Sequence, residues 1–249
     1  SEMCIRDSYE AGELLKVSKN TSLYATVFNR SKERNITADE MARPAVGMKY
    51  SKVIFVGDSR TVGMYATLNK QIGSSSSSGV SFVASAGQGL SWFQSEGYAK
   101  LLKEVEKAEG SLPVAVVFNL GVNDMANASN YVSYMTNIAS TLKSKNCKLF
   151  YMSVNPLNST MITKAGKGSR TEAQVREFNS KIRSGLSANY KYIDTYSVLM
   201  KTGYGTNASY NGEDSVSDDG LHYTTKTFKR IYYYCVIYLN TGSIDSFYY

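Results

Sequence analysis

From residue 50 onward, short apolar runs alternate with longer segments in which apolar residues recur at helical spacing. The runs occupy residues 52–57, 80–85, 114–120, 148–154 and 191–195, and their β-branched and aromatic content is typical of strands. Strands that are apolar throughout are buried on both faces, as in a parallel sheet covered by helices. With right-handed crossovers, the pattern predicts a three-layer α/β/α domain around a five-stranded parallel sheet.

Three of the intervening segments have the clearest helical periodicity. Apolar residues recur about every three or four positions over residues 131–142, 175–186 and 228–239, so each segment has one apolar face. The second of these follows a capping box at Thr171 and Gln174, in which each side chain satisfies a backbone N–H of the other residue. We therefore expect a helix to begin just after Thr171.

These elements place the boundaries of one domain at residues 50 and 242. The 249-residue chain is long enough for such a domain and a short appendage. Residues 1–49 form an N-terminal segment in this interpretation, and residues 243–249 form a C-terminal tail. Because all five strands lie after the N-terminal segment, we expect residues 50–242 to fold without it.

The N-terminal segment divides into three parts. Residues 1–8, SEMCIRDS, lack the features of a signal peptide and resemble translated adaptor sequence, so we interpret them as non-native and expect the protein to extend further upstream. Residues 9–28 resemble the tail of the β-grasp repeats of bacterial surface proteins, with an ordinary hairpin as the alternative. Residues 29–49 have linker composition. The β-grasp resemblance implies a piece of a larger bacterial protein that lies outside the cell or on its surface.

Charge and hydropathy limit the partners of the chain. Lys and Arg outnumber Asp and Glu by 28 to 21, but they form no block that is typical of a nucleic-acid-binding arm. We expect a solvated basic surface, with general attraction to an anionic cell-wall polymer as the alternative. No apolar run approaches the roughly 18–20 residues of a membrane span. The longest run, residues 231–239, is better explained by a buried helix.

Cysteine and histidine are scarce. Cys4, Cys147 and Cys235 have no C-x-x-C spacing and are too few for a disulfide framework. With His222 as the only histidine, none of the usual zinc sites can be assembled. We therefore expect a function that requires no metal and no cofactor.

Glycines and small polar residues follow the first three strands. The sequences are GDSRT, AGQG and GVND. In a sheet of order 2-1-3-4-5 these strands are neighbours, and ligands bind beyond their carboxyl ends. Ser59 follows the first strand, and Asn123 follows the third with an amide donor. Gly87 and Gly89 follow the second, where a backbone N–H can approach a ligand closely. A hydroxyl among such donors predicts a nucleophile with an oxyanion hole.

The stretch DDGLH, residues 218–222, supplies the base that a serine nucleophile requires. His222 is the only imidazole available for this role. Asp219 precedes it by three residues, where its carboxylate is placed to accept the Nδ1–H and fix the tautomer. Asp218 is the alternative partner.

Together these stretches resemble a known family. VIFVGDSRTVG, SAGQGLSW, LGVND and SDDGLH occur in the order of the four motif blocks of the SGNH/GDSL hydrolase superfamily, over about residues 51–240. The resemblance implies a flavodoxin-like fold with strand order 2-1-3-4-5. It implies Ser59 as nucleophile, His222 as general base and Asp219 as its orienting carboxylate. It further implies an oxyanion hole made by the serine N–H, a second-block glycine N–H and the Asn123 amide.

Five further residues bear on the oxyanion hole and the substrate. GDSR in place of the family's GDSL puts Arg60 near the substrate and favours polar or anionic groups. In the second block, Gly89 stands where the family's donor lies, and Gly87 is the alternative. Trp92 either lines an acyl or sugar pocket or packs in the core. Asn155, after the fourth strand, is expected to face the crevice.

These observations predict a serine esterase that removes a small acyl group, most simply acetyl, from a carbohydrate or cell-wall glycan. The esterase class depends on the site residues, whereas the acetylated glycan depends on the family resemblance and on the polar crevice. Two alternatives remain. One is a lipase or thioesterase of the same fold, which needs a longer apolar groove. The other is a surface glycan-binding module whose triad is vestigial.

Overall fold

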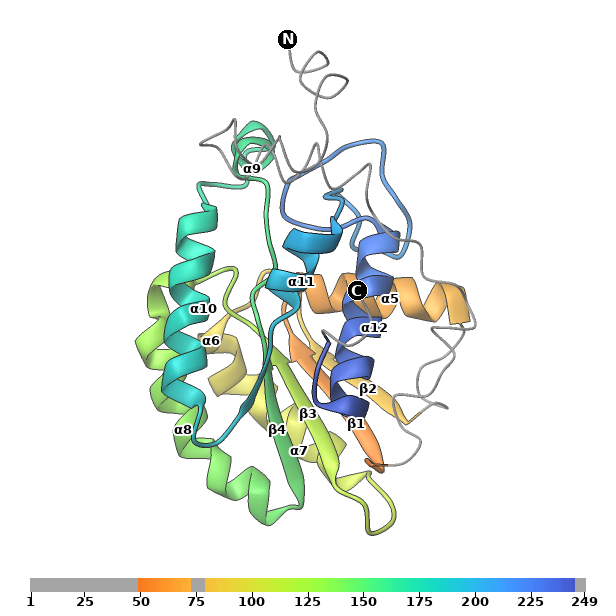
Figure 1. Cartoon of the computed structure of the whole chain (residues 1–249), viewed down its shortest axis with the longest axis vertical. Coiled ribbons are helices and arrows are strands. Elements are labelled where there is room, and N and C mark those ends of the chain that lie inside the picture. The colour runs from red at the N-terminus through yellow and green to blue at the C-terminus, as the bar shows by residue number, and fades with distance from the viewer. Residues whose placement is uncertain (1–48, 73–78, 245–249) are drawn as a thin grey trace.

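The computed structural model describes residues 49–72 and 79–244 of the chain. The predictions for the parts of the chain before residue 49 and after residue 244 lie outside these described residues. Five parallel strands form one sheet in the order β2-β1-β3-β4-β5, which confirms the predicted topology (Figure 1). The strands are β1 (Lys52–Gly57), β2 (Val80–Ala84), β3 (Val114–Asn119), β4 (Cys147–Met152) and β5 (Lys191–Ile193).

Alternate residues of the central strands point into two separate cores, one on each face of the sheet. Ile54 and Val116 belong to one core, and Phe55 and Val117 belong to the other. The first core is covered by α6 (Leu90–Trp92), η2 (Phe93–Gly97), α7 (Tyr98–Glu106), α8 (Ala128–Ser144) and α10 (Glu172–Leu186). The second is covered by α5 (Ser59–Ile72), α11 (Thr195–Thr202) and α12 (Thr225–Thr241). None of the helices in the described residues combines the length and apolar character that crossing a membrane requires.

Local sequence signals fix where two of these helices begin and end. Thr171 Oγ1 accepts the N–H of Gln174 at 3.2 Å, and Gln174 Oε1 accepts the N–H of Thr171 at 2.9 Å. This capping box confirms the predicted start of α10. Near the C-terminus, α12 ends at Gly242, whose φ of 82° is in the left-handed region that favours glycine.

The turn from β1 into α5 is tight because residue 57 is glycine. A Cβ at Gly57 would lie 1.9 Å from Thr61 Oγ1 and 2.8 Å from the backbone oxygen of Asn119. Without a side chain, the helix can start directly against the neighbouring strand β3. Ser59 therefore falls in the first turn of α5, at the carboxyl end of a central strand.

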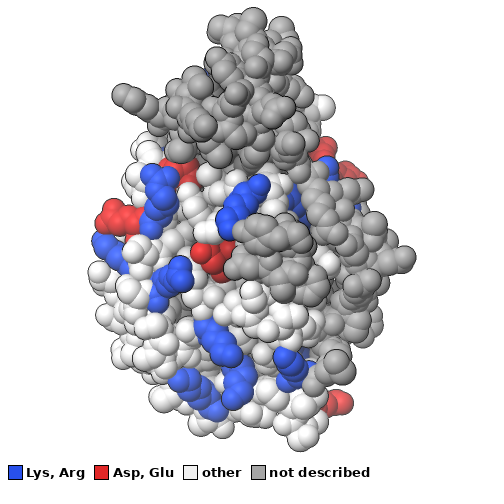
Figure 2. Space-filling model, in the orientation of Figure 1, with Lys and Arg blue, Asp and Glu red and all other residues white. Residues whose placement is uncertain are grey.

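Basic side chains gather at the opposite end of the sheet, where the strands begin. Lys49, Lys143, Lys148 and Lys191 line a hollow of about 490 Å³ there. Several Lys and Arg side chains are visible in the lower part of the face that Figure 2 shows. Part of the positive charge of the chain is thus concentrated away from Ser59.

Candidate active site

Ser59, His222 and Asp219 form a continuous line of hydrogen bonds. His222 Nε2 lies 2.9 Å from Ser59 Oγ, and His222 Nδ1 lies 2.6 Å from Asp219 Oδ2. All three residues are buried. Because a carboxylate can only accept, the proton of a neutral imidazole is assigned to Nδ1, and Nε2 is left to accept from the serine hydroxyl. The arrangement can therefore move a proton from Ser59 to His222.

Asp219, and not Asp218, contacts the imidazole. Burial alone would raise the pKa of Asp219, but hydrogen bonds from the side chain and backbone of His222 outweigh it and hold that pKa below its ordinary value. Asp218 instead accepts a hydrogen bond from the Thr206 hydroxyl at 2.9 Å. Of the two carboxylates that the sequence left open, the structure places only Asp219 within reach of His222.

Neighbouring loops hold the turn that carries His222. The N–H of Asn158 donates to the backbone oxygen of Gly220 at 2.8 Å, and the N–H of Asn207 donates to that of His222 at 2.9 Å. Gly220 has a φ of 69°, and a Cβ there would lie 2.4 Å from the backbone oxygen of Asn158. Glycine thus permits both the turn and its close packing, which fix the imidazole relative to the sheet.

The loops after β2 and β3 leave the sheet beside the loop that carries Ser59. Gly57 at the end of β1 pairs with Ala84 of β2 and with Asn119 of β3. The second-block glycines therefore emerge on one side of the serine, and Asn123 emerges on the other. The two loops also touch, because the Asn123 amide donates to the backbone oxygen of Gln88 at 2.8 Å.

Asp124 joins the same two loops, a role that the sequence reasoning missed. Its Oδ2 accepts the N–H of Leu90 at 2.9 Å, and its Oδ1 accepts from the Tyr131 hydroxyl at 2.7 Å. A Cβ on Gly89 would lie 2.4 Å from Asp124 Oδ2, so only glycine leaves room for the carboxylate. The available signal was an acidic residue directly after Asn123, because a carboxylate can bind the free N–H groups at the start of a helix, here α6.

A hollow of about 330 Å³ opens between these loops. Gly87, Gly89, Trp92 and Asn123 are among the residues that line it. Trp92 is also buried in the hydrophobic core. Most of the surface of Trp92 thus packs inside the protein, as one of the two interpretations expects, and the side chain also borders the hollow. Its contact with an acyl or sugar group stays a prediction.

The structure does not place Arg60 at the substrate, which corrects the sequence-based expectation. Arg60 is 4% exposed, and its guanidinium donates to the backbone oxygens of Leu221, Asn155 and Pro156 at 2.8, 2.8 and 3.2 Å. It also stacks on Tyr223, 4.8 Å from the ring centre. The arginine thus ties the loop after β4 to the turn that carries the histidine.

Asn155 requires the same correction, because it is buried and does not face the crevice. Its Oδ1 accepts a hydrogen bond from the Thr195 hydroxyl at 2.6 Å. Its backbone oxygen accepts from Arg60. Asn155 therefore belongs to a buried hydrogen-bond network with Thr195 and Arg60 beneath the site.

Asp58, next to the serine, is a buried carboxyl that titrates near neutrality. Burial raises its pKa to about 6, against the opposing effects of the Arg60 N–H and of the Arg60 and His222 charges. Asp58 therefore loses its charge as the pH falls through about 6, within the range where an esterase of this type would be assayed.

Three side chains near the site escaped the sequence reasoning because they lie in loops without a motif. The Tyr210 ring centre lies 5.5 Å from that of His222, and Tyr210 is 53% exposed. Lys167 Nζ lies 3.9 Å from the carboxylate that contacts the imidazole. Arg170 Nη2 donates to Asn123 Oδ1 at 3.3 Å.

Comparison with known proteins decides the family. The model of the GDSL-like lipase/acylhydrolase family matches residues 22–234. The chain belongs to this GDSL family. The match spans most of the chain, and the resemblance of the four motif blocks is thereby confirmed. No curated protein sequence matches this GDSL hydrolase significantly.

Solved structures share its fold at low sequence identity. The acetyl xylan esterase AlAXEase is 14% identical with a TM-score of 0.50, over 74% of this chain and 96% of its own. A candidate SGNH hydrolase from Slackia heliotrinireducens is 12% identical with a TM-score of 0.53, over 78% and 100%. A candidate GDSL-like lipase from Parabacteroides merdae is 14% identical with a TM-score of 0.51, over 79% and 100%. At these identities the likeness shows the fold alone.

Membership of the family establishes the class of reaction. This GDSL hydrolase is a serine ester hydrolase, as the sequence predicted. Within the described residues, no group of three or more His, Cys, Asp or Glu side chains is arranged to hold a metal ion.

Proposed function

We propose that this GDSL hydrolase removes a small acyl group, most simply acetyl, from an esterified carbohydrate, with Ser59 as the nucleophile. The line of hydrogen bonds from Ser59 through His222 to Asp219 is the observation that carries the proposal. A serine of ordinary acidity is a weak nucleophile and needs such a base. Asp219 holds the imidazole in the required tautomer and stabilises the imidazolium that forms.

The reaction follows from this geometry in two halves. Ser59 Oγ attacks the ester carbonyl carbon as its proton passes to His222 Nε2, and the carbonyl electrons move onto oxygen. Collapse of this intermediate breaks the bond to the alcohol, which leaves with the proton from His222. Water then attacks the acyl-enzyme and gives a proton to His222. The acid departs as Ser59 regains that proton.

The developing oxyanion needs donors that are already in place. We assign this role to the Ser59 N–H, the Gly89 N–H and the Asn123 amide. Among the described residues, the backbone N–H groups of Ser59 and Gly89 donate no hydrogen bond, and one Asn123 amide hydrogen remains after the bond to Gln88. Gly87 remains the alternative glycine. Its φ is 73°, and a Cβ built there would meet nothing within 4 Å. Such donors stabilise the charge that appears only in the transition state.

The small volume of the hollow beside the residues assigned to the oxyanion hole favours a short acyl group. The hollow measures about 330 Å³ and is lined by Gly87, Gly89 and Asn123 together with Trp92, Glu96 and Asp124, whereas Ser59 and His222 do not line it. A lipase would be expected to have a longer apolar channel. AlAXEase, which shares the fold, is by its name an esterase of an acetylated polysaccharide. A polysaccharide substrate also fits the proposed location outside the cell or on its surface.

Tyr210 supports a sugar as the group that carries the ester. His222 must give its proton to the leaving alcohol, so that alcohol lies against the imidazole. The half-exposed ring of Tyr210 is the aromatic surface beside the imidazole, 5.5 Å away. Rigid aromatic side chains supply contact area to a ligand at little entropic cost.

Removal of this ring should weaken binding of glycan esters only. We expect Tyr210→Ala to raise KM for an acetylated xylo-oligosaccharide by about 3- to 10-fold. The kcat/KM for ethyl acetate, which has no sugar to contact the ring, should change less than about twofold in a pH-stat assay. Tyr65→Ala is the matched control, since Tyr65 is a partly exposed tyrosine on α5 that packs against Phe82. Equal losses on both substrates in Tyr210→Ala would contradict the sugar assignment.

A panel of esters tests the proposed function itself. p-Nitrophenyl acetate, butyrate, octanoate and palmitate, together with an acetyl thioester, are compared by kcat/KM. We expect acetate to be the best substrate, with a steep decline as the acyl chain lengthens. A preference for long chains or for the thioester would favour the lipase or thioesterase. Failure to hydrolyse any of them would favour a glycan-binding module.

A further inference from the structure

Asn123, the side-chain donor assigned to the oxyanion hole, has a charged neighbour from a distant loop. Arg170 Nη2 lies 3.3 Å from Asn123 Oδ1, on the side away from Gln88, whose backbone oxygen lies 2.8 Å from Asn123 Nδ2. Arg170 is placed in the segment between α9 (Ser159–Lys164) and α10, 47 residues further along the chain.

These two neighbours leave the amide only one orientation. A guanidinium can only donate and a backbone carbonyl can only accept. With the amide reversed, its NH₂ would face the guanidinium and its oxygen would face the Gln88 carbonyl. In the observed orientation one Nδ2 hydrogen bonds Gln88, and the other is free for a substrate oxygen.

Arg170 is itself held firmly. Its Nε donates to the backbone oxygen of Val122 at 3.0 Å, and its Nη1 donates to that of Lys167. Residue 170 directly precedes the capping box at Thr171, so the start of α10 fixes its backbone. Burial lowers the pKa of Arg170, but an arginine remains charged at neutral pH.

We infer that Arg170 is a positioning residue of this esterase, which orients and polarises the Asn123 amide toward the oxyanion. This inference rests on the proposed function. Arg170 touches Asn123 and not the reacting atoms. Its positive charge beside Oδ1 draws electron density from the amide and makes the free N–H a stronger donor. The segment before α10 thereby contributes to an oxyanion hole whose donors come from other loops.

Loss of the guanidinium should lower kcat and leave KM nearly unchanged, because the amide acts on charge present only in the transition state. With p-nitrophenyl acetate, we expect kcat of Arg170→Met to fall about 10- to 100-fold, and that of Asn123→Ala to fall about 10²- to 10³-fold. Arg170→Lys should recover part of the loss, since lysine keeps the positive charge but not the planar, multi-donor geometry of the guanidinium.

The decisive experiment is a double-mutant cycle that combines Arg170→Met with Asn123→Ala. If Arg170 acts through Asn123, Arg170→Met will have almost no further effect on kcat in the Asn123→Ala background. The same fold-loss in both backgrounds would overturn the inference, because a general structural role would persist without the amide. Circular dichroism and melting temperature confirm that each variant is folded.

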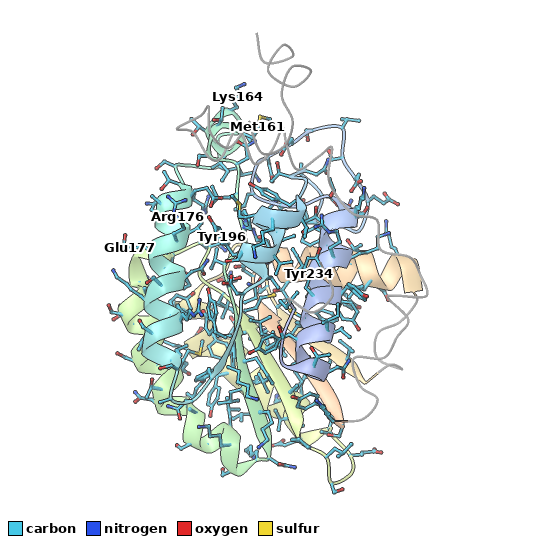
Figure 3. The ribbon with its side chains drawn as sticks, viewed as in Figure 1. Met161, Lys164, Arg176, Glu177, Tyr196 and Tyr234 are labelled. Carbon is cyan, nitrogen blue, oxygen red and sulfur yellow. The ribbon has the colours of Figure 1, made fainter. Side chains whose placement is uncertain are left out.

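Arg176→Met is the matched control. Arg176 is an exposed residue near the start of α10 and is labelled in Figure 3. Its loss should leave kcat unchanged. A comparable fall in kcat in Arg176→Met would overturn the specific role of Arg170. Absence of Ser59-dependent hydrolysis in the wild-type protein would overturn the proposed function and this inference together, whereas an additive cycle would overturn the inference alone.

Discussion

In a Ser59→Ala variant, we expect kcat for p-nitrophenyl acetate to fall by about 10⁶-fold, the scale on which loss of a serine nucleophile acts. His222 Nε2 would have no hydroxyl to deprotonate, and no acyl-enzyme could form. The residual rate would come from binding and the oxyanion hole alone. Steady-state kinetics at high enzyme concentration measure this loss.

The fold should survive this change. Ser59 Oγ contributes one hydrogen bond, to His222, and such a bond is worth about 1 kcal/mol. The melting temperature should therefore shift by no more than about 2–4 °C. Ser180→Ala, on the exposed side of α10, controls for loss of a serine elsewhere and should keep full activity. A folded Ser59→Ala protein that retained most activity would remove Ser59 as the nucleophile.

Asp219→Asn should reduce kcat by about 10⁴-fold, because an amide cannot both hold the Nδ1–H tautomer and stabilise an imidazolium. Asp218→Asn should cost less than about tenfold, since Asp218 bonds Thr206 and its own turn. The two variants carry the same chemical change one residue apart, so each is the other's control. A larger loss in Asp218→Asn would contradict the geometry proposed for the base.

The pH dependence of the wild type separates His222 from the nearby carboxyls. The base that accepts the serine proton must be neutral, so kcat/KM should fall toward low pH. Asp219, whose pKa is below its ordinary value, stays ionised over this range. Asp58, with a pKa of about 6, is the competing explanation. The fall in kcat/KM at low pH should persist in Asp58→Asn. If the fall is lost in this variant, the titrating group is Asp58 and not His222.

The sheet could be predicted because its signal is local. β1 and β3 are apolar on both faces, and only a covered central strand buries both faces at once. The contact between Asp219 and His222 was equally accessible, since three residues of one turn bring the two side chains together. The strand ends could be placed side by side once the strand order was assumed.

The direction of individual side chains could not be predicted in the same way. Arg60 follows the serine directly, yet its guanidinium bonds the backbone oxygen of Leu221, 161 residues away. Whether a polar residue at a strand end faces the crevice or the interior depends on such distant acceptors. Tyr210 and Arg170 reach the site from loops for the same reason, and no spacing in the sequence indicated them.

The most direct test of the central claim is covalent labelling with a fluorophosphonate, which reacts with activated serines by the attack proposed for the ester. Intact mass and peptide mapping locate the adduct. We expect a single adduct on Ser59, its absence in Ser59→Ala and much slower labelling in Asp219→Asn. No adduct on the folded wild-type protein, or an adduct on a different serine, would contradict the role of Ser59 as the activated nucleophile.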